Sequence, residues 1–168
     1  WVFYDGPHNI PESGNGKPDI LDEVKWELDW LLKMQDPSSG GFYAIVNAGG
    51  CPSTVAGPCT PDLQTGSYIL DVVNGANNVR PTPETANAVA ALARAAEVYR
   101  TYDPALAASY LTAAESGWAY LMANPEVIPS TGLTYGSNTD IDNRFWAAAE
   151  LFRTTGKAVY NNYFLAHY

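Results

Sequence analysis

Five carboxylates crowd one short stretch of the sequence, and they are the first residues with the chemistry of a general acid and base. They are Asp19, Asp22, Glu23, Glu27 and Asp29. A catalytic pair is one interpretation of such a cluster. The other is structural, because acidic residues complement the dipole of a helix N-terminus, and Asp29 and Lys33 have the i,i+4 spacing of a surface ion pair. We favour the structural interpretation.

Aromatic residues are the second group that can do recognition chemistry. Trp26 and Trp30 lie one helical turn apart, so both rings face the same way. Such a pair can stack on the apolar faces of sugar rings, although a core stripe is its commoner use. Tyr4, Tyr43 and Tyr135 fall in segments expected to be loops, where binding roles are more usual.

An oxygen-rich segment near the C-terminal third is a candidate cation site. Its side-chain oxygens come from Thr131, Ser137, Asn138, Thr139, Asp140, Asp142 and Asn143. Calcium needs about six to eight oxygen ligands. The spacing is not that of an EF-hand, and Asp140 or Asp142 can instead cap the following helix. Both interpretations remain open at this stage.

The two cysteines bear on whether the protein is secreted. Cys51 and Cys59 stand in a segment rich in Gly and Pro, and their spacing is not that of a CxxC motif. A local disulfide would suit a secreted protein, and two unpaired thiols are the alternative. The sequence contains no HExxH, GxSxG, Walker or GxGxxG motif, which argues against the corresponding metal, serine and nucleotide chemistries.

Helices must position these side chains. Helical periodicity and breaker residues predict helices over about 18–35, 83–102, 104–123 and from Asp140 or Asp142 to Gly156. Between about 37 and 82, many Gly and Pro residues interrupt the pattern, and only short strand-like runs remain. Successive helices joined by short loops, with no parallel-strand rhythm, predict an all-α fold of antiparallel hairpins.

Composition limits the function classes. The chain has 168 residues, 46% of them hydrophobic, which is enough for one core and argues against long disorder. Nine basic against eighteen acidic residues give a net charge of −9, which argues against a nucleic-acid partner. No apolar run approaches the ~20 residues of a membrane span. The chain begins at Trp1 without a basic, apolar leader, so we expect a processed or partial chain.

Several segments, in order, resemble glycoside hydrolase family 9, the cellulases with an (α/α)6 barrel. The run NIPESGNGKPDILDEVKWELDWLLKMQ resembles a hallmark segment of that family, and the following GGFY resembles its GGVYH-like strand. PETANAVAALARAAEVY and DPALAASYLTAAESGWAYL are similar to its next two barrel helices. TGLTYGSNTDIDNRFWAAAELFRTTG resembles its TGxYGDxxxxDExxWAAAELxxxTG segment.

The resemblance implies that residues 1–168 are part of a secreted (α/α)6-barrel domain that cleaves β-1,4-glucosidic bonds with inversion, with an irregular or short-strand loop at about 37–82. Inversion needs a general acid and a carboxylate base ~6.5–9.5 Å apart. The family's base lies in a DAGDxGK-like motif and its acid near the C-terminus, beyond a DRNPxG-like segment. Neither motif occurs here, so we assign no catalytic residue, and Asp5, Glu12 and Asp19 do not take that role.

Binding residues follow from the same resemblance. We expect glucan contacts from Trp1, Tyr4, Asp5, His8, Tyr43 and Trp146. We expect a structural calcium ion, if any, at Thr131, Asp140 and Asp142. Ser137 and Asn143 replace two carboxylates of the family pattern, so such a site would be weak. Ala44 replaces the family's frequent histidine.

Two alternatives to a cellulase-like enzyme stay open. The missing acid and base motifs favour a non-catalytic remnant that binds glucan or a protein. A different αα-barrel enzyme, an epimerase or a lyase, is the third hypothesis, against which the ESGNG-to-DILDE segment speaks. Because the helices are apolar around much of their girth, we expect the rest of a catalytic domain or a second copy to cover them.

Overall fold

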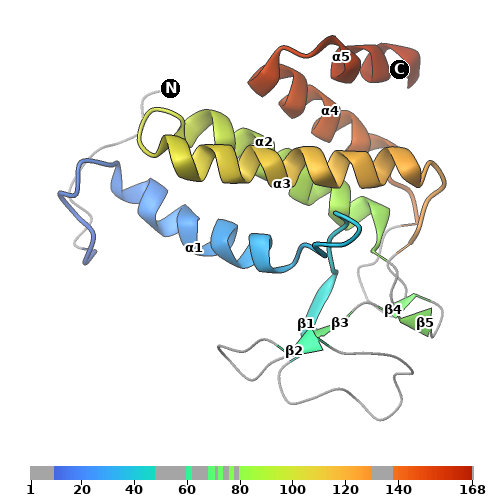
Figure 1. The fold of residues 1–168 in the computed structure, drawn as a ribbon, viewed down its shortest axis with the longest axis horizontal. Coiled ribbons are helices and arrows are strands. Elements are labelled where there is room, and N and C mark those ends of the chain that lie inside the picture. The colour runs from blue at the N-terminus through green and yellow to red at the C-terminus, as the bar shows by residue number, and fades with distance from the viewer. Residues whose placement is uncertain are drawn as a thin grey trace.

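Five α-helices form the body of the molecule in a computed structural model (Figure 1). They are α1 (Asp19–Lys33), α2 (Thr82–Tyr99), α3 (Pro104–Ala123), α4 (Ile141–Thr155) and α5 (Ala158–His167). The residues that the structure describes are 10–47, 60–61, 68–70, 72–73, 76–77, 80–129 and 138–167. The predicted all-α architecture is confirmed, and none of the described helices is long and apolar enough to cross a membrane.

Short strands occur where the sequence predicted an irregular or strand-like connection. The strands β1 (Ile45–Asn47), β2 (Thr60–Pro61) and β3 (Tyr68–Leu70) form an antiparallel sheet in the order β1-β3-β2. A second ribbon pairs β4 (Val72–Val73) with β5 (Ala76–Asn77). Both lie beyond one end of the helices (Figure 1).

The helix ends follow local rules. Asp103 caps α3, since its carboxylate accepts a hydrogen bond from the Leu106 amide at 3.1 Å. Gly156 ends α4 with φ +69°, and its amide donates to the Phe152 carbonyl at 2.7 Å. The predicted helix begins at about residue 18, but Pro18 has an extended conformation with ψ 130°. The first helical residue of α1 is therefore Asp19.

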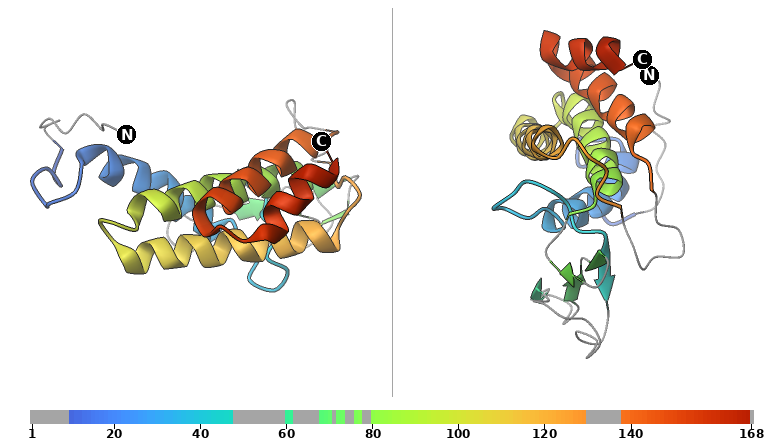
Figure 2. Two further views of the ribbon diagram at one scale, coloured as in Figure 1. Left: turned by 90° about the horizontal axis from the view of Figure 1, so that it is seen from above. Right: turned by 90° about the vertical axis from the view of Figure 1, so that its right-hand side faces the viewer.

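The core forms around α2, which packs against both α3 and α4 (Figure 2). Small residues permit this closeness: a Cβ on Gly117 of α3 would lie 2.5 Å from Val89 Cγ2 of α2. Aromatic contacts join α3 to α5, because the Trp118 ring meets Tyr160 and Tyr163 edge to face at 5.6 and 4.9 Å between centroids. The predicted antiparallel hairpins are therefore present.

Apolar side chains also face outward on several helices. Trp26 is 75% exposed and Trp146 is 47% exposed, and both α1 and α5 carry further exposed apolar residues. The Trp26 ring is thus not part of the core that the described residues form. Open apolar faces are what a part of a larger helical assembly presents.

The antiparallel order of α1 to α4 brings one end of each to the same side of the molecule, next to the strands (Figure 1). The C-terminal ends of α1 and α3 meet the N-terminal ends of α2 and α4 there. We call this side the loop end and define it by residues 34–44, 80–82, 124–129 and 138–140. Residues far apart in the sequence are neighbours at the loop end, so it is where a site can form.

Candidate functional site

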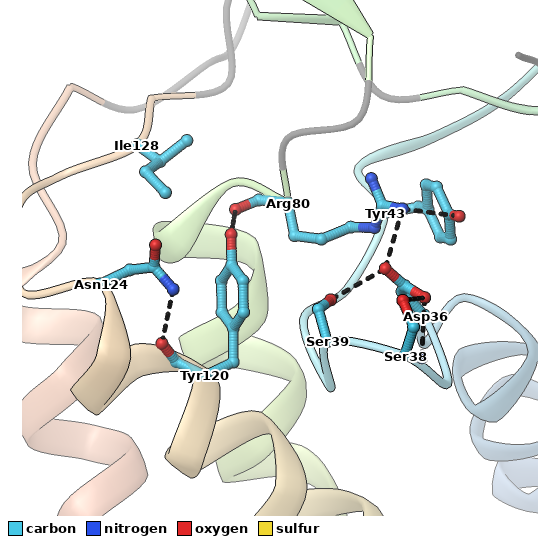
Figure 3. Close-up of a pocket in the computed structure, with 8 residues that line it drawn as sticks. All are labelled: Asp36, Ser38, Ser39, Tyr43, Arg80, Tyr120, Asn124 and Ile128. Atoms are coloured by element: carbon cyan, nitrogen blue, oxygen red, sulfur yellow. Dashed lines mark hydrogen bonds and ion pairs between the residues drawn. The ribbon is translucent and has the colours of Figure 1, made fainter.

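Arg80, at the start of α2, is the centre of the loop end (Figure 3). Its side chain is 7% exposed. The guanidinium donates to Asp36 Oδ2 at 3.0 Å and to the Tyr43 hydroxyl at 2.7 Å, and its Cζ lies 3.7 Å from the centroid of the Tyr43 ring. The Tyr120 hydroxyl of α3 donates to the Arg80 carbonyl at 2.6 Å. Arg80 thereby joins the segments that follow α1 to the end of α3.

Asp36 is fixed by the tight turn that follows α1. Its carboxylate accepts hydrogen bonds from the Ser38 amide at 2.9 Å, the Ser38 hydroxyl at 2.8 Å and the Ser39 hydroxyl at 2.8 Å. Burial acts to raise the pKa of Asp36, but these hydrogen bonds and the charge of Arg80 outweigh it and hold the pKa below its usual value. Asp36 is therefore ionised near neutral pH.

This lowered pKa predicts a pH-dependent stability difference for Asp36→Asn. A carboxyl whose pKa is lower in the folded state stabilises the fold above its unfolded pKa of ~3.9 and loses that contribution as the pH falls through the folded pKa. We expect the variant to lose about 2 kcal/mol at pH 7 and distinctly less at pH 3.

Urea unfolding at both pH values measures this difference. Asp142→Asn is the matched control, because that carboxylate is exposed and its replacement should change stability by less than ~0.5 kcal/mol. An Asp36→Asn deficit that is equal at the two pH values would contradict the prediction.

A cavity of about 590 Å³ opens beside Arg80. It is lined by Asp36, Ser38, Ser39, Tyr43, Arg80, Tyr120, Asn124 and Ile128 (Figure 3). The lining combines hydroxyl, amide and charged groups with two tyrosine rings and one aliphatic side chain. Such a lining can bind a polar molecule of sugar size by hydrogen bonds. Asp36 is the one carboxylate among the described residues that line it, so these residues do not form an acid–base pair.

Two of the predicted glucan contacts, Tyr43 and Trp146, lie among the described residues. Tyr43 lies in the cavity wall, whereas Trp146 projects from α4 and is not among the residues that line the cavity. The other predicted contacts, Trp1, Tyr4, Asp5 and His8, lie outside the described residues, as does the Cys51–Cys59 pair. Sequence reasoning missed Arg80, Asp36 and Tyr120.

Asp140 is positioned differently from either expectation. It occupies the N-cap position of α4, yet its carboxylate makes no capping hydrogen bond. Instead it is buried and accepts from Arg144 Nε at 2.8 Å. Arg144, 3% exposed, also donates to the carbonyls of Leu121 at 2.8 Å and Asn124 at 2.7 Å. The helix start is therefore tied to the end of α3 by a guanidinium.

These contacts bear on the predicted calcium site. Asp140 already faces a full positive charge, Asp142 is exposed, and Thr131 lies outside the described residues. Asn143, at a position where the family pattern has a carboxylate, donates its amide to Asn87 Oδ1 at 2.7 Å. Among the residues described, no group of three or more acidic, His or Cys side chains could hold a metal. The described side chains by themselves therefore do not form a calcium site, and the predicted set with Thr131 stays a prediction.

Comparisons with known proteins agree on one family. The profile described as Glycosyl hydrolase family 9 matches residues 1–168. The chain is 35% identical, over 98% of its length and 19% of the relative's, to a cellulose 1,4-beta-cellobiosidase of Acetivibrio thermocellus. It is 36% identical, over 91% of its length and 14% of the relative's, to endoglucanase C of Cellulomonas fimi.

Solved structures extend the likeness to three dimensions. A metagenome-derived family 9 endoglucanase superimposes with a TM-score of 0.74 at 37% identity, covering 98% of this chain and 29% of that one. The chain spans about a fifth of the length of the curated relatives it matches, as the 19% covered in the cellobiosidase illustrates.

Proposed function

Because the chain belongs to glycosyl hydrolase family 9, we propose that it is part of a catalytic domain that hydrolyses β-1,4-glucosidic bonds with inversion. The observation that carries this proposal is the match of the family over all 168 residues. The polar cavity at the loop end supports it, since a glucan chain needs hydroxyl-binding groups along its path. Cellulose is a polymer outside the cell, so we also propose that the protein is secreted.

In this proposal the chain contributes substrate contacts and not the reacting carboxylates. Inversion requires one protonated carboxyl and one carboxylate that activates water. The two buried carboxylates that we describe above, Asp36 and Asp140, are each paired with an arginine, which suits neither task. Tyr43 and Trp146 are the described residues that we propose as glucan contacts, and the acid and base would come from other parts of the catalytic domain.

The test is hydrolysis of soluble cello-oligosaccharides by the protein that carries this chain. We expect release of reducing ends, with the α-anomer as the first product by proton NMR, because attack by water inverts the β-linkage. The 168-residue chain by itself is the control and should release none, since it lacks both family motifs. A longer protein that cleaves no soluble β-1,4-glucan would refute the proposal.

A non-catalytic, glucan-binding remnant is the second candidate, favoured by the arginine-paired state of Asp36 and Asp140. It predicts calorimetric binding of cello-oligosaccharides by the same protein without any release of reducing ends. A protein that binds no β-glucan would exclude this candidate as well.

A further inference from the structure

We propose that Trp26 on α1 forms a second glucan-binding site, where its indole ring stacks on one pyranose unit of a β-1,4-glucan chain. This inference rests on the proposed function and adds to it a surface that holds the polymer away from the reacting bond. The N-terminal end of α1 lies at the opposite end of the helices from the strands, and so from the loop end (Figure 1).

The Trp26 ring is exposed on a charged face of α1. Its exposed fraction is 75%, the largest of the exposed apolar side chains in the described residues. Residues three or four positions apart share a face of a helix. By that spacing the neighbours of Trp26 are Asp22, Glu23, Asp29 and Trp30. A large aromatic ring among carboxylates is therefore available to a ligand from solution.

The face of α1 that suits burial against further helices is a different one. Ile20 and Val24 are exposed apolar residues of the same helix. At 3.6 residues per turn they lie roughly 120–160° around the axis from Trp26. Aliphatic side chains of that kind can be covered by another helix without loss, whereas the carboxylates beside Trp26 would be costly to bury. The covering of open apolar faces therefore does not account for Trp26.

Polar groups beside the ring can bind sugar hydroxyls. Among the described residues, a cavity of about 220 Å³ is lined by Glu12, Asp22, Lys25, Trp26 and Asp29. Asp22 Oδ2 accepts from Asn15 Nδ2 at 3.0 Å, and Lys25 Nζ donates to Asp29 Oδ2. A carboxylate offers about four acceptor positions on its two oxygens. Asp22 and Asp29 can therefore each accept a further hydrogen bond from a hydroxyl.

The size of this cavity agrees with a contact along a polymer. Pockets that enclose a small ligand usually measure ~300–1,000 Å³, so this one covers only part of a sugar. A pyranose unit has C–H faces for an aromatic ring and a hydroxyl edge for the groups beside it. Trp30, also exposed, follows Trp26 by ~6 Å along the helix axis, close to the length of one sugar unit. It can contact the next unit of the chain.

Trp26→Leu and Trp26→Tyr test the site in the protein that carries this chain. Leucine keeps an apolar side chain without a ring, and tyrosine keeps a ring. We expect the Kd for insoluble cellulose, measured by depletion of the protein from solution, to rise ~5-fold for Trp26→Leu and less than ~2-fold for Trp26→Tyr. The kcat/KM for cellotetraose should stay within ~2-fold of wild type in both, since the second site lies apart from the reacting bond.

Leu165→Ala is the matched control. Leu165 is 66% exposed but lies on α5, so its replacement should leave cellulose binding unchanged. A folded Trp26→Leu protein that binds cellulose as tightly as the wild type would overturn the second site. Equal losses in Trp26→Leu and Trp26→Tyr, or an equally large fall in kcat/KM for cellotetraose, would also overturn it.

Failure of the proposed function has a different result. A wild type that hydrolyses no cellotetraose would refute that function. The cellulose-binding difference between Trp26→Leu and Trp26→Tyr would still decide the second site, because it needs no hydrolysis.

Discussion

Replacing Arg144 by methionine should lower the free energy of unfolding by about 3–5 kcal/mol. The guanidinium is 3% exposed and makes three interactions, with Asp140 Oδ2 and with the carbonyls of Leu121 and Asn124. Methionine has a similar length but no donor. The Asp140 carboxylate would then be buried beside no cation, and both carbonyls would lose their donor, which is costlier than losing a surface pair.

Urea unfolding of the wild type and Arg144→Met measures this loss. Arg153→Met is the control, because Arg153 also lies on α4 and pairs with Glu97 at 3.2 Å, but it is 38% exposed. An exposed pair of that kind contributes ~0–1 kcal/mol, so we expect a small change. Calcium should not restore the stability of Arg144→Met, since a cation there would need ligands that the described side chains do not supply. Equal losses in the two variants would contradict the prediction.

The helices were predictable because their signals are local. The Asp103-Pro104 start of α3 and the Gly156 end of α4 appear in the structure with the hydrogen bonds that those residues imply. The sequence also predicted where the regular helical pattern fails, and the short strands lie within that region. Periodicity alone predicts helical hairpins but not how they are arranged. The prediction that they form part of a barrel came from the family resemblance.

The Arg80 cavity was not predictable in the same way. Arg80 and Asp36 are 44 positions apart in the sequence, and Arg80 and Tyr120 are 40 apart. These pairs meet only because antiparallel helices return to the same end of the molecule. A lone arginine before a helix gives no signal of its own, so the contacts that make it a candidate binding residue exist only in three dimensions.

The ion pair between Asp140 and Arg144 had a signal in the sequence, but we gave other features more weight. An aspartate four residues before an arginine on a helix is a recognised ion-pair spacing, and Asp140 and Arg144 have it. The oxygen-rich surroundings and the family resemblance instead suggested a calcium ligand or a cap. In the structure the buried Asp140 carboxylate pairs with the buried Arg144 guanidinium, because a buried arginine needs a carboxylate beside it.

Gly40→Ala is expected to destabilise the protein by about 2–4 kcal/mol. Gly40 has φ +83°, and an added Cβ would lie 2.5 Å from Ser116 Oγ and 2.6 Å from the Ser116 carbonyl oxygen on α3. Alanine therefore meets two penalties, an unfavourable backbone conformation and a clash with backbone that cannot move without shifting a helix. The Gly40 carbonyl also accepts from Gln35 Nε2 at 2.8 Å, so the turn cannot simply swing outward.

Gly14→Ala separates the two penalties. Gly14 has a similar φ of +87°, but a Cβ there would meet nothing within 4 Å, so only the backbone penalty of about 1 kcal/mol applies. The difference between the two variants in urea unfolding is then the cost of the Ser116 contact. Because Gly40 closes the turn that presents Asp36 to Arg80, any folded Gly40→Ala protein should also bind cellotetraose more weakly, whereas Gly14→Ala should not. Equal stabilities and affinities in the two variants would mean that the turn and α3 adjust freely, and that the cavity does not depend on their close contact.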